Sequence, residues 1–317
     1  MARLERSKRI VFGKDIEESI NPDNLKLIKR YKMNLTNEGK SAATIYNYER
    51  DLLNWLSYVN VYQDNVHVKD LEMEDIEEFI FFCREQGNNN DRINRRLSVI
   101  SPFYEDFLMV RNYADSNPTK GIKRPQRGLP VEKKVFLTKE QVEKIREWLK
   151  EEDDLQLTTY FELSIATMAR VNAVSNLTWN HIDYEMGIIN DIIEKGQEPV
   201  KLMLTDYVQD LLKQLHKQRE EEEIDSEYIF LVKYGGSYSK ASTNNMRGWA
   251  KRIGEVVDEP ELSPHDFRRT GATLRSHAGQ PFEQISSLLN HKGLDVTKRY
   301  IQEDLAKKKA EFSKYEI

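Results

Sequence analysis

The sequence predicts a mainly helical α+β protein of two domains with one small antiparallel sheet. Apolar residues recur three or four positions apart through most of the chain, as they do on helices that bury one face. The apolar spacing changes to two between residues 187 and 204, which predicts a pair of short strands. A basic stretch rich in glycine and proline, residues 117–134, separates two helical parts. Because 317 residues suggest about two domains, we expect this stretch to be an interdomain linker.

Four helices are expected before the linker, and they predict a small helical domain over residues 22–116. The first helix is expected around Asn24–Met33. The periodic apolar positions of the other three extend over Ile45–Val59, Ile76–Cys83 and Ile93–Leu108. Nothing in this domain has a catalytic pattern.

Three local features refine this first domain. Residues 1–21 precede its first helix and are expected to form an N-terminal extension, for which a disordered tail stays open. Ser41 is placed to cap the helix that begins near residue 42. Cys83, the only cysteine, lies on an apolar helical face. We therefore expect a buried structural thiol rather than a disulfide or a zinc ligand.

The second domain is expected over residues 135–317. Thr138-Lys-Glu-Gln141 has the spacing of a capping box and begins a helix. A further helix carries Leu163–Ala173. The alternating segments Gly187–Ile193 and Val200–Leu204 then predict two strands joined by a tight turn. All remaining elements are expected to be helices, over Tyr207–Lys217, Asn244–Val257, Ser263–His277, Pro281–His291 and a tail from about Asp295.

The charge pattern bears on the partner and the location. A net charge of −5 argues mildly against a general nucleic-acid binder, since affinity for DNA comes largely from lysine and arginine. No signal peptide and no apolar run of membrane-spanning length occurs, so we expect a soluble cytoplasmic protein without a membrane partner. Basic residues nevertheless gather in the linker, at Lys120, Lys123, Arg124, Arg127, Lys133 and Lys134.

A helix start in the second domain has the features of a phosphate site. In Ser263-Pro-His265-Asp266, serine is placed as the N-cap, proline takes the first helical position and Asp266 the capping-box position. His265 and Arg268 then share the first turn, beside free backbone N–H groups that attract phosphate. Arg170 follows an apolar run, near a helix end, where it could complete a two-arginine clamp. Taken alone, each side chain is more often a surface or ion-pair residue.

Three further residues could supply proton transfer and a nucleophile. Lys195 lies at the tip of the predicted hairpin, His291 in the last turn of a helix, and Tyr300 nine residues later. An imidazolium is favoured at a helix C-terminus and can donate to a phosphate oxygen. The alternatives are an exposed turn lysine, a capping histidine and a core tyrosine.

In this order and context, the six residues resemble those of the tyrosine recombinase (phage integrase) family. The resemblance extends over nearly the whole chain from about residue 40. It rests on seven phrases, namely Asn94-Arg-Arg-Leu-Ser-Val-Ile, Ser116-Asn-Pro-Thr-Lys-Gly-Ile, Thr167-Met-Ala-Arg170-Val-Asn-Ala-Val-Ser-Asn-Leu-Thr-Trp, Lys195-Gly, His265-Asp-Phe-Arg268-Arg-Thr-Gly-Ala-Thr, Leu288-Leu-Asn-His291 and Thr297-Lys-Arg-Tyr300.

The resemblance implies a two-domain DNA clamp, with a helical core-binding (SAM-like) domain and an integrase-type catalytic domain. It implies that Tyr300 attacks a DNA phosphate to form a 3′-phosphotyrosyl bond, without metal, ATP or another cofactor. The implied partners are double-stranded DNA and further copies of the chain, a dimer per site and a tetramer in synapsis. The tail 301–317 could dock on a neighbouring copy or pack on its own domain. The expected DNA-binding residues are the six basic linker residues together with Arg95, Arg96 and Arg269.

Three departures from the family pattern keep other functions open. Related sequences often carry glycine where this chain has Met168-Ala169 and Asn290, and an acidic residue where it has Ala173. Weaker support of the catalytic groups could abolish activity. The alternatives are therefore a repressor or architectural DNA-binding protein on the same fold and, as a third class, a type IB topoisomerase-like enzyme.

Overall fold

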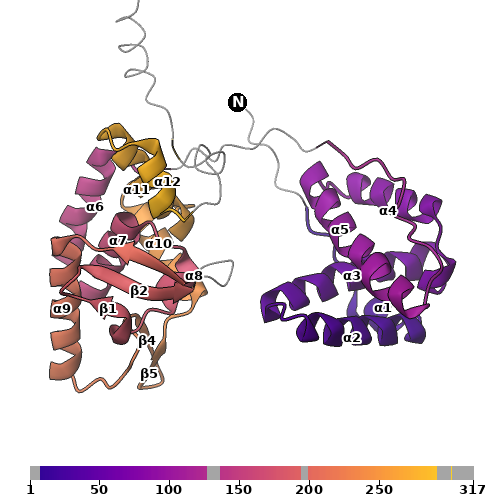
Figure 1. Cartoon of the computed structure of the whole chain (residues 1–317), viewed down its shortest axis with the longest axis horizontal. Helices are drawn as coiled ribbons and strands as arrows, with labels where there is room; N and C mark the ends of the chain where they lie inside the picture. Colours follow the sequence, from indigo (N-terminus) through magenta and orange to yellow (C-terminus); the bar gives the residue numbers. More distant parts are fainter. Residues whose placement is uncertain (1–7, 127–135, 194–198, 291–300, 302–317) are drawn as a thin grey trace, which may run out of the picture. The chain divides into compact units, whose positions relative to one another are not determined.

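The computed structural model describes residues 8–126, 136–193, 199–290 and 301. It divides into two compact units, Met1–Val131 and Glu132–Ile317. The expected class is confirmed, because the described chain is mostly helical with small antiparallel sheets. Figure 1 shows the elements of each unit. No helix in the described ranges is both long and apolar enough to cross a membrane.

Unit 1 is an all-helical bundle over its described residues, and the four expected helices are all present. The helices bury a core of large side chains in which Trp55 is fully buried and Tyr31 packs on Phe103 at 5.1 Å between ring centroids. The expected helix near 93–108 changes to a π-helical turn at Phe103–Leu108. The main helices are α1 (Lys14–Glu18), α2 (Pro22–Asn37), α3 (Ala42–Tyr62), α4 (Met73–Glu85) and α5 (Asn90–Pro102).

Two local predictions for unit 1 are confirmed. The Ser41 hydroxyl accepts a hydrogen bond from the Thr44 amide at 3.2 Å, which satisfies a free donor at the start of α3. Cys83 is 1% exposed. Its burial raises the pKa of the thiol to about 11, so the side chain remains a neutral part of the core.

The folded part of unit 1 begins earlier than the expected residue 22. Ile20 is 1% exposed, and Phe12 stacks on Phe82 at 6.1 Å between ring centroids. The Arg50 guanidinium donates two hydrogen bonds to the Glu17 carboxylate, at 3.0 and 2.7 Å. Residues 8–21 therefore pack on the helical domain. The sequence did not predict α1, because this helix is too short to show a helical spacing of apolar residues.

The described part of the basic linker also lies on unit 1. Lys120 pairs with Glu105 at 2.9 Å. Arg124 donates to the Ser98 hydroxyl at 2.8 Å, and Lys123 is exposed. The other expected linker cations, Arg127, Lys133 and Lys134, lie outside the described residues.

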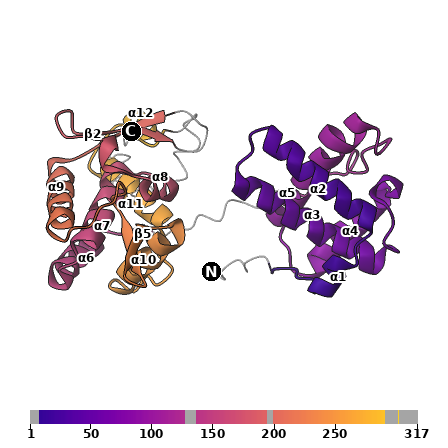
Figure 2. The same cartoon turned by 90° about the horizontal axis from the view of Figure 1, so that it is seen from below.

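Unit 2 is built around α7 (Leu155–Thr167), whose apolar residues are buried on nearly all sides. Helices α9 and α11 pack against α7, as Figures 1 and 2 show. Tyr160 and Phe161 of α7 both meet Phe267 of α11 edge to face, at 5.9 and 5.5 Å between centroids. The other helices are α6 (Lys139–Glu152), α8 (Val171–Ser175), α9 (Asp206–Glu221), α10 (Thr243–Glu255), α11 (Pro264–His277) and α12 (Phe282–Leu288).

The predicted strand pair is present as part of a three-stranded antiparallel sheet. The sheet has the order β1 (Ile182–Asp183), β2 (Ile188–Ile193) and β3 (Pro199–Met203). Residues Ile189 and Leu202 pair across it and are buried in the unit 2 core. The capping box at Thr138 and Gln141 is confirmed as well.

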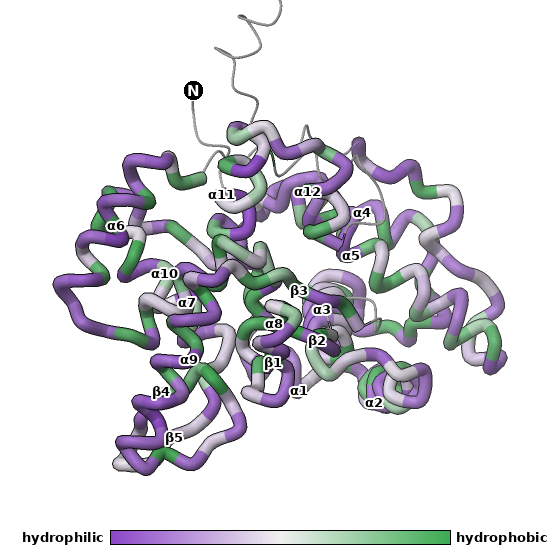
Figure 3. Tube along the Cα trace, turned by 60° about the vertical axis from the view of Figure 1, so that its left-hand side comes forward, coloured by the Kyte–Doolittle hydropathy of each residue, from purple (hydrophilic) through white to green (hydrophobic). Residues whose placement is uncertain are grey.

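Three details of the sequence prediction for unit 2 were wrong. The segment after α9 is not entirely helical, because β4 (Leu231–Tyr234) and β5 (Ser237–Lys240) form a hairpin. All residues of β5 are exposed, so no alternating apolar pattern marks the strand, and Figure 3 shows the hairpin mostly in the hydrophilic colour. The expected helix over 163–173 is interrupted at Met168, and α12 ends before residue 291.

Candidate active site and DNA-binding surfaces

The described part of the predicted site centres on the buried guanidinium of Arg268. This side chain is 1% exposed and lies near the start of α11. Its Nη1 donates to the carbonyl oxygen of Met168 at 2.5 Å, and its Nη2 donates to that of Leu289 at 2.5 Å. Met168 is two residues before Arg170, and Leu289 is two residues before His291. Thus, the backbones beside two other expected catalytic residues meet at Arg268.

An apolar cluster underlies this convergence. Its buried members are Met168, Ala272, Ile285 and Leu289, and Ile301 packs against them. Ile301 follows the expected nucleophile directly in the sequence. The cluster therefore brings the chain next to residue 300 to the same place as the carbonyl groups that hold Arg268.

Arg170 lies in the short connection between α7 and α8. It is partly buried and occupies the N-cap position of α8, in extended conformation. The preceding Met168 is left-handed, with φ of 55°, and this residue ends α7. Ala173, three residues after Arg170, is 3% exposed and belongs to the unit 2 core. A carboxylate at that position would be buried, and the alanine avoids this cost.

The predicted helix start at residue 263 is confirmed. The amide and the hydroxyl of Ser263 both donate to Asp266, at 3.0 and 2.6 Å, and Pro264 is the first helical residue. His265 is exposed in the first turn, one turn before Arg268. Arg269 lies 3.5 Å from the Asp266 carboxylate. The α11 terminus therefore presents an imidazole to solvent beside a fixed guanidinium.

The remaining expected catalytic residues, Lys195, His291 and Tyr300, lie outside the described residues.

Both positions where this chain lacks the usual glycine have left-handed backbone. The φ of Met168 is 55° and the φ of Asn290 is 50°. Such angles are uncommon in residues other than glycine, and asparagine tolerates them best. The fold therefore keeps the geometry that glycine would favour at both ends of the Arg268 clamp, and the Met168 side chain fills the apolar cluster below it.

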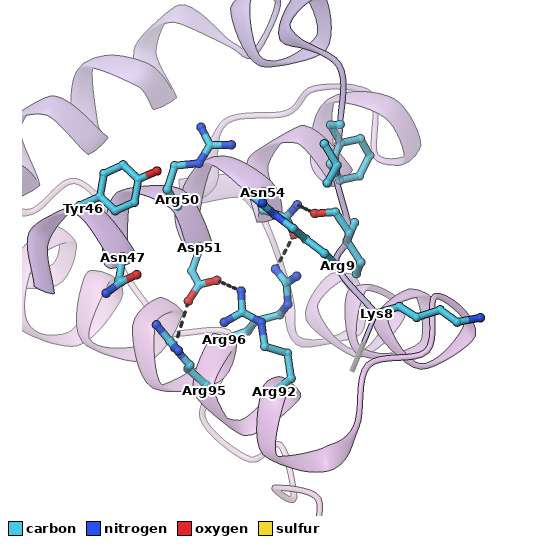
Figure 4. A pocket seen from close by; sticks show the side chains of 13 residues that line it. Lys8, Arg9, Tyr46, Asn47, Arg50, Asp51, Asn54, Arg92, Arg95 and Arg96 are labelled. Carbon is cyan, nitrogen blue, oxygen red and sulfur yellow. Dashed lines mark hydrogen bonds and ion pairs between the residues drawn. The ribbon is translucent and has the colours of Figure 1, made fainter. Parts of the chain in front are cut away.

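A basic pocket of about 330 Å³ lies in unit 1, between the N-terminal segment, α3 and α5. Figure 4 shows arginines around Asp51, which is the only acidic residue among the described residues of the lining. Arg92 pairs with Asp51 at 2.5 Å and Arg95 at 3.6 Å. The basic residues of the lining are Lys8, Arg9, Arg50, Arg92, Arg95 and Arg96.

Two adjacent arginines of this pocket have different roles. The Arg95 side chain is 54% exposed. Arg96 is 3% exposed, and its guanidinium donates to the side-chain oxygens of Asn88 and Asn54. Burial lowers the pKa of Arg96. Arg95 can therefore contact a phosphate, whereas Arg96 faces the interior and joins α3 to α5.

Sequence reasoning missed several cations that the structure exposes or places in the pocket. Arg92 precedes Arg95 by one helical turn, a spacing that could have predicted a shared face. In unit 2, the sequence from Tyr228 to Gly254 contains no acidic residue, although the whole chain carries a negative net charge. That stretch exposes basic side chains at Lys233, Lys240, Arg247, Lys251 and Arg252.

Two family descriptions match the two units. "Phage integrase family" matches residues 135–307, which is more than half of the chain. "Phage integrase, N-terminal SAM-like domain" matches residues 28–112. The chain belongs to the phage integrase family. It is a tyrosine site-specific recombinase that acts on DNA, as the six residues predicted.

Curated relatives of this recombinase match it along most of their length. Tyrosine recombinase XerD of Listeria monocytogenes serovar 1/2a is 26% identical over 274 residues, which cover 84% of this chain and 90% of the relative. Tyrosine recombinase XerD of Halalkalibacterium halodurans is also 26% identical, over 83% of this chain and 87% of the relative.

Solved structures share the recombinase fold at lower sequence identity. The Tn1549 transposon integrase in complex with circular intermediate DNA is 14% identical with a TM-score of 0.66, over 90% of this chain and 98% of that one. A lambda integrase dimer bound to a COC′ core site is 16% identical with a TM-score of 0.65, over 92% of this chain and 81% of that one.

Proposed function

We propose that this recombinase cleaves and rejoins DNA through a covalent bond between Tyr300 and the 3′ phosphate. The tyrosine oxygen attacks phosphorus, the bond to the 5′ oxygen breaks, and a 5′ hydroxyl leaves. The phosphotyrosyl bond keeps the energy needed for rejoining, so the cycle requires no ATP. The meeting of Met168, Leu289 and Ile301 around Arg268 supports this proposal, because these residues lie close in sequence to Arg170, His291 and Tyr300.

Two arginines would stabilise the charge that builds on the non-bridging oxygens. Arg268 is held by two carbonyl groups in a buried position, so little reorganisation is needed when a phosphate arrives. Arg170 would bind the phosphate from the α7–α8 connection. Because a preorganised donor is worth about 10²–10³ in rate in other enzymes, each arginine is expected to matter on that scale.

The proton transfers are assigned to the remaining three residues. Lys195 would donate a proton to the departing 5′ oxygen as the general acid. His265 and His291 would orient the phosphate and accept the proton of Tyr300. His265 is exposed at the start of α11, where the positive end of the helix dipole would also favour a bound phosphate. The proposed chemistry uses these side chains and no cofactor.

The two units would form a clamp around double-stranded DNA in the cytoplasm. The basic linker residues, Arg95 and Arg269 would contact phosphates, with Arg96 in support. We further propose a dimer on each site and a tetramer in synapsis, in which the tail 301–317 docks on a neighbouring copy. A solved structure with the same fold, the lambda integrase dimer bound to a COC′ core site, supports the dimer.

The nucleophile can be tested on a nicked suicide duplex that carries a site the protein has been shown to bind. Wild type should form a denaturant-resistant adduct, and Tyr300→Phe should form none while its DNA affinity is unchanged. Tyr234→Phe is the matched control, because Tyr234 is 88% exposed on the β4–β5 hairpin and should keep full adduct formation. An undiminished adduct in Tyr300→Phe would refute the assignment.

The DNA contact in unit 1 can be tested with the adjacent pair Arg95 and Arg96. Arg95→Ala should make the plot of log K for DNA binding against log salt concentration less steep by about 0.9, as expected for one lost phosphate contact. Its free energy of unfolding should be unchanged. Arg96→Ala should instead lower the free energy of unfolding by about 1–3 kcal/mol, because Asn54 and Asn88 lose their partner. Equal effects of the two variants would contradict the separate roles.

A further inference from the structure

A solvent-exposed aromatic groove lies on unit 1, on α3 and α4. Its volume is about 540 Å³. Phe81 is 65% exposed and Tyr62 is 58% exposed, which is unusual for such large apolar side chains. The rim carries carboxylates and, among the described residues, no lysine or arginine. The groove is lined by Tyr58, Tyr62, Glu74, Glu77, Glu78, Phe81, Phe82 and Glu85.

The chemistry of the groove favours a cation on an apolar stem. The rings of Tyr58, Tyr62 and Phe82 form a cluster with centroid distances of 5.1, 4.8 and 5.3 Å. Aromatic faces attract guanidinium and ammonium groups, and the four glutamates add ion pairs. DNA is repelled by this rim. Two copies of the groove repel each other for the same reason, so the occupant must be basic.

The start of the described chain lies at one end of the groove. The Lys8 amide donates to the carbonyl oxygen of Gly87 at 3.2 Å, and the Asn88 side chain donates to the Lys8 carbonyl at 2.9 Å. Gly87 comes two residues after Glu85. Seven residues can span about 23–25 Å when extended, whereas α4 rises about 17 Å between Glu74 and Glu85. Residues 1–7 can therefore reach the whole groove.

The chemistry of residues 1–7 matches that of the groove. The segment Met1-Ala-Arg3-Leu4-Glu5-Arg6-Ser7 places Leu4 and Glu5 between two arginines, so its basic side chains outnumber its single acidic one. Arginine binds carboxylates in bidentate geometry and stacks on aromatic rings, which lysine does less well. We propose that residues 1–7 dock in this groove of their own chain, with Arg3 and Arg6 on the glutamate rim and Leu4 on Phe81.

A disulfide test can detect this docking in the full-length protein. In a Cys83→Ala background, Leu4→Cys is combined with Phe81→Cys, which leaves the three-ring cluster in place. The matched control combines Leu4→Cys with Met33→Cys, since Met33 is 63% exposed on α2 of the same unit. The docked pair should form an intrachain disulfide about fivefold faster than the control, because docking raises the effective concentration of the two thiols.

If residues 1–7 of the same chain do not fill the groove, a non-reducing gel shows different products or different rates. A disulfide-linked dimer as the main product would mean that a second copy fills the groove, and this outcome overturns the proposal. Equal intrachain rates for Phe81→Cys and Met33→Cys would overturn it as well. Circular dichroism of both variants establishes that unit 1 is folded, since all substituted positions except Cys83 are exposed or precede Lys8.

Charge reversal tests the ion pairs separately. Glu77→Lys with Glu85→Lys should reduce the intrachain rate to that of the control, and added Arg3→Glu and Arg6→Glu should restore it. Glu147→Lys with Glu151→Lys makes the same charge change at exposed positions of α6 in unit 2, and should leave the rate unchanged. A rate that is insensitive to the rim charges would exclude arginine docking.

Discussion

Gly271 determines how closely α11 approaches α7, and its replacement tests whether this contact positions Arg268. A Cβ atom at residue 271 would lie 2.3 Å from the carbonyl oxygen of Ile165 and 2.7 Å from Cγ of Met168. The first neighbour is backbone and cannot rotate away. Gly271→Ala must therefore move α11 by about 1 Å from the end of α7, because packed interiors have no free volume to absorb a methyl group.

The expected magnitudes follow from this displacement. Overpacking a core usually costs about 1–3 kcal/mol in the free energy of unfolding. Residue 271 is one turn after Arg268, so the same shift lengthens the 2.5 Å bonds from Arg268 to Met168 and Leu289. A displacement of about 1 Å in a catalytic group can reduce the rate about 100-fold. Activity should thus fall further than stability alone would cause.

Both quantities can be measured on Gly271→Ala. Urea unfolding gives the stability, and single-turnover adduct formation on the suicide duplex gives the rate at a temperature where the variant is folded. Gly248→Ala is the control for stability, because a Cβ there meets nothing within 4 Å, and it should stabilise α10 by about 0.5–1 kcal/mol. Wild-type stability and rate in Gly271→Ala would refute the packing argument.

Further predictions concern the left-handed residues and the buried thiol. Asn290→Gly should raise the free energy of unfolding by about 0.5–1 kcal/mol, because φ is 50° and its buried Nδ2 has no partner among the described residues. Met168→Gly should lower it by about 1–3 kcal/mol, since the lost packing outweighs the relieved strain; a gain in stability would contradict this. The raised pKa of Cys83, about 11, predicts stability that is fully present below about pH 8.5 and lost as pH rises toward 11, since the unfolded thiol ionises first. Urea titrations at pH 8 and 10 should show this loss in wild type and less of it in Cys83→Ala.

Local sequence patterns predicted most of the fold, because they act over a few residues. The capping residues Ser41, Thr138 and Ser263 each lie at the helix start where the sequence placed them. The elements that were missed lack such a signal. Strand β5 is exposed throughout, so its side chains have no reason to alternate, and α1 has only five residues.

Chain reversals were less predictable, because backbone conformation there depends on distant neighbours. Met168 and Asn290 are ordinary residues by sequence, and a continuous helix was expected through the first of them. Their positive φ angles arise where α7 and α12 end against the Arg268 side chain. No local rule contains that information.

The sequence by itself determined the family, because Arg170, Lys195, His265, Arg268, His291 and Tyr300, in their order and within their local phrases, resemble the tyrosine recombinase pattern. Only the tertiary structure decided which basic residues can work together. It separated the exposed Arg95 from the buried Arg96, which are neighbours in sequence. It also joined residues 168, 268 and 289 at one guanidinium, since hydrogen bonding and burial depend on distances in space and not along the chain.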